Sequence, residues 1–91
     1  MYYHFGWVRG TDISFTPIMF VEAEGKEYLM VHFERDKEGT DGADFADMEV
    51  PGFIYRKSYG YSESELAWLK SFMRSNYATL WEAARNGGEP L

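Results

Sequence analysis

The sequence predicts an α+β domain in which an antiparallel β-sheet of three to five strands is packed by one long C-terminal helix. Two features predict this fold. Residues 62–86 carry apolar side chains at steps of three and four, which is the period of a helix. Residues 2–57 contain short runs of aromatic and β-branched residues separated by turn formers, which is typical of strands. A chain of 91 residues holds one hydrophobic core, so we expect a single domain spanning residues 1–91.

The expected helix has a start signal and a stop signal. Ser62 and Glu65 have the spacing of a capping box, in which each side chain accepts from the backbone N–H of the other residue. Arg85 is followed by Asn86, two glycines and a proline, the order that ends a helix. Ser75-Asn76 is a weak helical dipeptide and a candidate kink, but no proline or glycine interrupts the run. The stripe expected to face the sheet contains Leu66, Leu69, Met73, Tyr77, Leu80 and Ala84.

Trp68 does not belong to this stripe. At helical spacing it falls about 160–200° from the centre of the stripe. One interpretation is a tryptophan that lies over a neighbouring loop or strand. The other is an exposed anchor for a partner, because tryptophan is enriched among the residues that dominate binding energy in interfaces.

Turn-forming residues divide the first two thirds of the chain into strands. Gly10-Thr11-Asp12 ends the first strand, and Glu24-Gly25 has the composition of a tight hairpin turn. Pro17 falls within the second strand, which places it at an edge, a bulge or a break, because proline has no N–H to donate. Pro51-Gly52 separates two short strands. The expected strands are Tyr2–Val8, Ile13–Ala23, Tyr28–Arg35, Met48–Val50 and Phe53–Arg56.

A two-residue turn at Glu24-Gly25 predicts which side chains share a face of the sheet. It places Phe20 opposite Leu29, with Ile18 opposite Val31 and Thr16 opposite Phe33 on the same face. Both faces would then be apolar, whereas a sheet with one wet face should alternate apolar and polar residues. One helix covers one face, so the N-terminal strand, the loop after Arg35 or another chain must cover the other. The opposite face would hold Phe15, Met19, Val21, Tyr28 and Met30.

Residues 36–47 are rich in aspartate and glycine, which predicts a long mobile loop. Calcium loops of the EF-hand type need glycine at the sixth position and glutamate at the twelfth. Counting from Asp36, Gly39 and Gly42 miss the sixth position, and the twelfth residue is Asp47. We therefore expect a solvated loop without a metal.

Composition limits the classes of function. The formal net charge is −6, from 15 acidic and 9 basic residues, which argues against a nucleic-acid backbone binder. The chain has no cysteine, which suits a reducing, cytoplasmic compartment and leaves no thiol nucleophile or disulfide. No apolar run reaches the ~18 residues of a membrane span, and no signal peptide is visible. We expect no cofactor, no nucleic-acid partner and no membrane partner.

The sequence offers little catalytic machinery. His4 and His32 are the only histidines, and they fall on different expected strands without a recurring ligand spacing. Either histidine could act as a general base, since imidazole titrates near neutrality. Two lone strand histidines are more often structural or surface groups. With no cysteine and no Gly-x-Ser-x-Gly elbow, we expect a protein that is not an enzyme.

Tyr55, Tyr59 and Tyr61 lie close to the basic pair Arg56-Lys57. Tyrosine and arginine suit interfaces because each combines a flat apolar body with polar groups. These tyrosines are therefore a candidate contact surface. The alternative is a strand end that packs on the start of the helix.

The end of the chain resembles a known family. Residues 80–91 read Leu-Trp-Glu-Ala-Ala-Arg-Asn-Gly-Gly-Glu-Pro-Leu, which is similar to the C-terminal helix and Pro-Leu ending of small bacterial proteins of the DUF4160 type. The likeness covers the last third of the chain. The His-Asn-Pro-Pro-His-x-His-like segment of that family is absent here. The resemblance implies a bacterial protein, but it carries no established activity and no functional residue.

Together these features predict a non-catalytic protein-interaction domain, which self-associates as a homodimer or binds a protein partner through an apolar and aromatic sheet face. One alternative is an acidic DNA mimic or phage-type inhibitor, which requires carboxylates such as Asp41, Asp44 and Asp47 on one face. The other is a small enzyme using histidine or carboxylate chemistry, which requires a concave pocket holding at least two such groups. The residues expected to contact a partner are Phe15, Met19, Val21, Tyr28, Met30, Tyr55, Tyr59, Tyr61 and Trp68.

Overall fold

The computed structural model describes residues 2–36 and 42–87, which form six strands and two helices. The α+β class and the antiparallel sheet are confirmed. The expected count of three to five strands is wrong, because a break around Pro17 divides the second expected strand in two. In chain order the elements are β1 (Tyr3–Val8), β2 (Thr11–Phe15), β3 (Met19–Val21), β4 (Lys26–Asp36), β5 (Ala43–Val50), β6 (Ile54–Tyr59), α1 (Glu63–Ser75) and α2 (Tyr77–Arg85).

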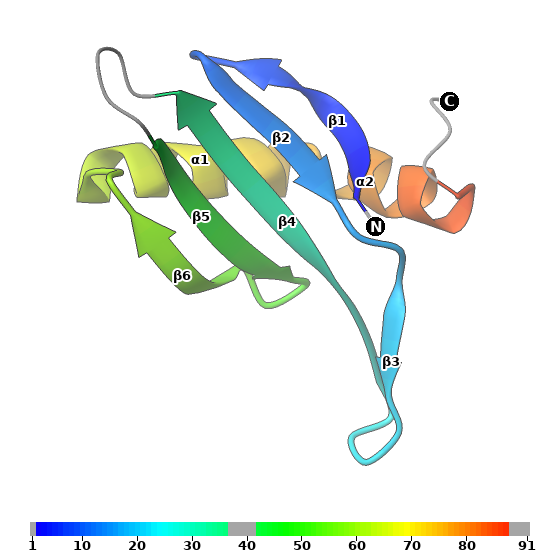
Figure 1. Cartoon of the computed structure of the whole chain (residues 1–91). Coiled ribbons are helices and arrows are strands. Elements are labelled where there is room, and N and C mark those ends of the chain that lie inside the picture. Colours follow the sequence, from blue (N-terminus) through cyan, green and yellow to red (C-terminus); the bar gives the residue numbers. More distant parts are fainter. Residues whose placement is uncertain (1, 37–41, 88–91) are drawn as a thin grey trace.

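The sheet has the strand order β1-β2-β4-β5-β6, and every neighbouring pair is antiparallel. Strand β3 pairs with β4 alone, beyond the end of β2. Figure 1 shows the resulting shape: β3 and the first part of β4 extend from the sheet as an arm, and both helices lie on one side of the sheet. We call the side opposite the helices the open face.

The single C-terminal helix expected over residues 62–86 is two helices. The capping box is present, since the Ser62 side chain accepts from the Glu65 N–H and the Glu65 side chain accepts from the Ser62 N–H. Asn76 separates α1 from α2, with φ −107° and ψ 15°. Its side-chain Nδ2 donates to the Phe72 carbonyl at 2.8 Å. This local bond competes with regular helix geometry, which explains why the helix breaks at the weak dipeptide rather than continuing.

The core lies between the sheet and the helices. Alternate residues of β2, β4 and β5 face the helices, and α1 and α2 contribute the side chains that cover them. Burial of this apolar surface is the main force that holds the two layers together. The buried core residues are Ile13, Phe15, Leu29, Val31, Phe33, Ala46, Met48, Val50, Leu69, Met73, Leu80, Ala83 and Ala84.

The expected two-residue turn is wrong. Phe20 lies opposite Glu27 and Val21 opposite Lys26, so the loop has four residues, Glu22–Gly25. Phe15, which was expected on the outer face, lies in the core at 1% exposure. The alternation of side chains does not carry from β2 into β3, because residues 16–18 leave the strand. In this break the Thr16 hydroxyl accepts from the Met30 N–H at 3.0 Å.

The open face is polar at its centre, so the expectation of two apolar faces is also wrong. His32 lies opposite both Ser14 and Asp47, and Glu34 lies opposite Asp12. A polar surface can remain in contact with water, so the sheet does not require a second covering layer. Evidence for a partner must therefore come from the residues that are exposed on the open face.

Within the described part of the expected loop over residues 36–47, all residues except Gly42 belong to strands. β4 continues to Asp36, and β5 begins at Ala43, so Asp44 and Asp47 belong to a strand. Residues 37–41 of this expected loop lie outside the described residues. In the described parts of the chain, no helix is long and apolar enough to cross a membrane.

Candidate functional site

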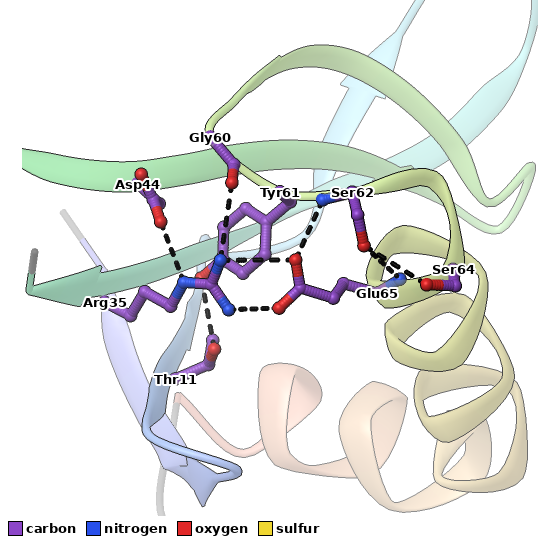
Figure 2. Close-up of polar contacts among 8 residues, drawn as sticks. All are labelled: Thr11, Arg35, Asp44, Gly60, Tyr61, Ser62, Ser64 and Glu65. Carbon is purple, nitrogen blue, oxygen red and sulfur yellow. Dashed lines mark hydrogen bonds and ion pairs between the residues drawn. The ribbon is translucent and has the colours of Figure 1, made fainter.

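A cluster of charged side chains joins the sheet to the start of α1 (Figure 2). Arg35, near the end of β4, donates from Nε to Asp44 Oδ2 of β5 at 2.9 Å. Its two terminal nitrogens both donate to the Glu65 carboxylate, one of them at 3.2 Å. The Gly60 carbonyl accepts from the same guanidinium at 3.3 Å. One arginine thus connects β4, β5, the segment before α1, and α1 itself.

The charges in this cluster stabilise one another. The hydrogen bond from Arg35, together with a smaller contribution from the backbone N–H of Ser62, lowers the pKa of the Glu65 carboxyl to about 2. Hydrogen bonds to Glu65 and Asp44 raise the pKa of Arg35 above its ordinary value. Gly60 makes the close approach of the chain possible, because a Cβ there would lie 1.9 Å from Asp44 Oδ1. The guanidinium of Arg35 therefore binds the carboxylates of both Asp44 and Glu65.

Trp68 lies against the turn between β1 and β2. The guanidinium carbon of Arg9, in this turn, is 3.8 Å from the centroid of the Trp68 ring. On its other side Trp68 stacks with Phe72, with ring centroids 5.4 Å apart. Trp68 is half-buried, so the interpretation in which it lies over a neighbouring loop fits the structure. Trp68 is nonetheless one wall of a cavity.

This cavity of about 80 Å³ lies between the Arg9 turn and the Arg35 cluster. Thr11 is almost fully buried, and its hydroxyl is 3.1 Å from the hydroxyl of Tyr61, which also lines the cavity. Burial raises the pKa of Tyr61 more than the Thr11 hydrogen bond lowers it, so the phenol is un-ionised at neutral pH. The lining residues are Arg9, Thr11, Arg35, Tyr61, Glu65, Trp68 and Leu69.

The open face carries two histidine–carboxylate pairs. His4 Nε2 is 2.8 Å from Asp12 Oδ1, and His32 Nδ1 is 2.7 Å from Asp47 Oδ1. His32 Nε2 is also 3.3 Å from Glu34 Oε1. Partial burial lowers the pKa of His32, but the hydrogen bonds and charges of Asp47 and Glu34 outweigh burial and raise it above 6.5. Both histidines are therefore occupied by carboxylates of the same face.

Large apolar side chains flank these pairs. The register of the sheet aligns five residues in one row across β1, β2, β4, β5 and β6, with aromatic rings towards both ends and carboxylates between them. Trp7 is 69% exposed and Tyr59 is 60% exposed, and Tyr59 stacks on Phe45 at 6.1 Å. We call this set the aromatic row. It consists of Trp7, Asp12, Glu34, Phe45 and Tyr59.

A groove of about 710 Å³ runs between the β3–β4 arm and the turn that connects β5 to β6. Strand β5 pairs with β4 only from Leu29 onward, so Lys26–Tyr28 pair with β3 on one side of β4. The Glu49 carboxylate accepts from Arg56 along the rim. Ile54 contributes exposed apolar surface to the lining. The lining residues are Val21, Glu24, Lys26, Glu27, Tyr28, Glu49, Pro51, Gly52, Ile54 and Arg56.

The residues expected to contact a partner are divided among several places. Val21 and Tyr28 line the groove, Met19 lies opposite Tyr28, and Met30 is half-buried next to the open face. Tyr59 ends the aromatic row.

The others face the interior. Phe15 is in the core, and Tyr61 and Trp68 line the small cavity. The Tyr55 hydroxyl donates to the Leu66 carbonyl at 2.6 Å, and burial raises the pKa of Tyr55 to about 12. The three tyrosines expected as one surface are thus separated, because Tyr55 and Tyr61 pack inward and Tyr59 points outward.

Sequence reasoning missed Trp7, Arg9 and Arg35. No alternation in the first strand identifies Trp7, because a β-bulge between His4 and Gly6 brings His4 and Trp7 to one face, whereas a regular strand would place them on opposite faces. No local signal identifies Arg35, because its partner Glu65 is 30 residues away in the chain.

The described residues give no metal site: no group of three or more His, Asp or Glu side chains among residues 2–36 and 42–87 could hold an ion. Neither histidine lines the cavity or the groove. A comparison with protein-family models, with curated proteins and with solved structures found no match. The resemblance of residues 80–91 to the DUF4160 type therefore stays a prediction.

Proposed function

We propose that this chain is a non-catalytic protein-interaction domain, which binds a second copy of itself or another protein through the open face. The observation that carries the proposal is the aromatic row, in which Trp7 and Tyr59 remain exposed on the face that neither α1 nor α2 covers. Tryptophan and tyrosine are enriched among the side chains that dominate binding energy. Exposed apolar surface that extends across a sheet commonly marks a contact site.

The polar residues of the open face suit recognition rather than catalysis. Asp12 and Glu34 lie between the rings of the aromatic row, where they would supply hydrogen-bond acceptors to a partner. Charges of this kind set the orientation and specificity of an interface more than its affinity. The expected affinity therefore comes chiefly from the two exposed rings.

The two alternatives have less support. A DNA mimic should display clustered, uncompensated carboxylates, but Asp12, Asp47 and Glu49 each contact a basic side chain, and Asp44 is buried. An enzyme should hold its acid–base groups in a concave pocket, but His32 lies on the open face, outside both hollows described above.

The test is association measured by sedimentation velocity over a concentration series. We expect a concentration-dependent dimer, and replacement of Trp7 and Tyr59 by serine should weaken it about 30-fold or more, as for a residue worth about 2 kcal/mol. Phe20→Ser is the matched control. Phe20 is 58% exposed, but it lies opposite Glu27, which bonds to Arg85 of α2, and so is on the helix side of the arm.

A chain that stays monomeric at all concentrations would remove self-association. Protein capture from the native host, with wild type and the Trp7→Ser/Tyr59→Ser variant in parallel, then tests whether the chain binds another protein. A partner that the wild type and the double variant retain equally would contradict the role of the aromatic row.

A further inference from the structure

The cavity beside Trp68 is lined on one side by Arg9, an exposed side chain. Among residues 2–36 and 42–87, no carboxylate forms an ion pair with Arg9 and no acceptor takes a hydrogen bond from its side chain. The guanidinium carbon of Arg9 lies over the Trp68 ring, 3.8 Å from the ring centroid. A flat guanidinium that stacks on a ring keeps its N–H groups directed outward from its edge, where they can bind an oxyanion in a forked arrangement.

The hydroxyl groups of the cavity also have a donor to spare. The Thr11 and Tyr61 oxygens share one hydrogen bond of 3.1 Å. Each hydroxyl has one proton, so whichever group donates, the proton of the other has no acceptor among the described residues. Burial keeps the Tyr61 phenol in its protonated form, so this second proton is present at neutral pH.

The acceptors of the cavity are already in use. Glu65 accepts from Arg35 through both oxygens and from the Ser62 N–H through Oε1 at 2.8 Å. Arg35 also pairs with Asp44, which lies outside the lining, so the lining residues include two arginines and one carboxylate, Glu65. Arg9 and one hydroxyl remain as unmatched donors, so the cavity suits a group that only accepts hydrogen bonds and carries negative charge.

We propose that the cavity lined by Arg9, Thr11, Tyr61 and Trp68 binds a small oxyanion, a carboxylate or a phosphate group. The oxygens would accept from the Arg9 fork and from the Thr11–Tyr61 hydroxyl pair. A volume of about 80 Å³ admits several waters or a group of a few heavy atoms. This site is separate from the aromatic row and does not depend on the function proposed above.

The probes are acetate and inorganic phosphate, titrated into the full chain while ¹H–¹⁵N spectra are recorded. We expect saturable shifts of the Trp68 indole N–H and the Arg9 Nε–H, with half-saturation in about the millimolar range. The two anions distinguish a carboxylate site from a phosphate site. Sodium chloride at matched ionic strength gives the response that comes from screening alone.

Arg9→Gln should raise the half-saturation concentration at least tenfold, and Arg9→Lys should weaken binding as well, because the ammonium lacks the planar fork. Arg74→Gln is the matched control. The Arg74 guanidinium also lies over an aromatic ring, Phe53, at 5.4 Å, but it lines no part of this cavity, so binding should be unchanged.

Two results would overturn the proposal. The first is a set of shifts that rise linearly with acetate and phosphate and equal those with chloride. The second is saturation that is the same in Arg9→Gln and Arg9→Lys as in the wild type. Urea unfolding of each variant checks that it is folded; should Arg9→Gln unfold, Arg9→Lys and the chloride comparison still decide the question.

Discussion

The ion pair between Arg35 and Glu65 makes the stability of the fold depend on pH in a defined window. The pKa of the Glu65 carboxyl is lowered from 4.5 to about 2 by the hydrogen bond from Arg35. A carboxyl whose pKa is lower in the folded chain stabilises the fold above its unfolded pKa, and loses this contribution as pH falls through its folded pKa. The loss should therefore occur between about pH 4.5 and pH 2.

The perturbation is Glu65→Gln. Glutamine can replace glutamate in a capping box, so the start of α1 keeps its cap while the charge is removed. The full pKa shift would correspond to about 3 kcal/mol at 1.36 kcal/mol per unit. The Glu65 side chain is 40% exposed, so solvent screens the pair and we expect about 1 kcal/mol.

The measurement is the free energy of unfolding in urea at several pH values from 7 to 2. The difference between wild type and Glu65→Gln should be about 1 kcal/mol near neutrality and should shrink towards zero at pH 2. Glu63→Gln is the control, because Glu63 also lies in the first turn of α1 but forms no ion pair with another described residue. A difference that is constant with pH, or equal in Glu63→Gln, would refute the reasoning.

Three further predictions follow from the packing of single residues. Gly60→Ala should destabilise the fold by about 2 kcal/mol or more in urea unfolding, because φ is +87° and the new Cβ would overlap the Asp44 carboxylate. Met73→Ala should cost about 2–5 kcal/mol, because Met73 is fully buried between helix and sheet and its removal leaves a cavity. Asp47→Asn should lower the pKa of His32 measured by NMR titration, because it removes the negative charge of the carboxylate that lies beside His32 Nδ1.

Each of these three predictions has a control substitution in the same chain. Gly10 has φ +75° with open space around it, so Gly10→Ala should cost less than Gly60→Ala. Thr79→Ala, on the exposed side of α2, should change stability by less than about 0.5 kcal/mol. Asp12→Asn, which removes the carboxylate of the other histidine pair, should leave the pKa of His32 unchanged. Equal effects within any of these pairs would contradict the stated cause.

Local signals in the sequence predicted local structure well. The capping box at Ser62 and the turn at Pro51-Gly52 depend on residues close together in the chain, and both are present; at Pro17, for which the sequence left an edge, a bulge or a break open, the structure has a break. The helical stripe also identified most of the buried helix residues, such as Leu69 and Met73, because a periodic pattern survives a local kink.

The features that failed depend on side chains whose partners the sequence does not identify. The face assigned to Phe15 was wrong because three residues outside the strand reset the alternation of side chains. The helix end at Asn76 depends on one side chain that bonds back to Phe72. The Arg35 cluster and the cavity beside Trp68 bring together residues from distant parts of the chain, and a single sequence carries no pattern for such pairs.

Because the helix breaks at Asn76, the stability of α2 depends on the rest of the fold. α2 has nine residues and no side-chain bond at its N-cap, whereas an isolated helix in water needs about 12–15 residues to be even marginally populated. Its stability therefore depends on the backbone hydrogen bonds that link it to α1 through Asn76 and on the core in which Leu80 and Ala84 are buried. The sheet therefore stabilises α2. A change that loosens the sheet should unfold α2 before it disturbs α1, which has a capped N-terminus.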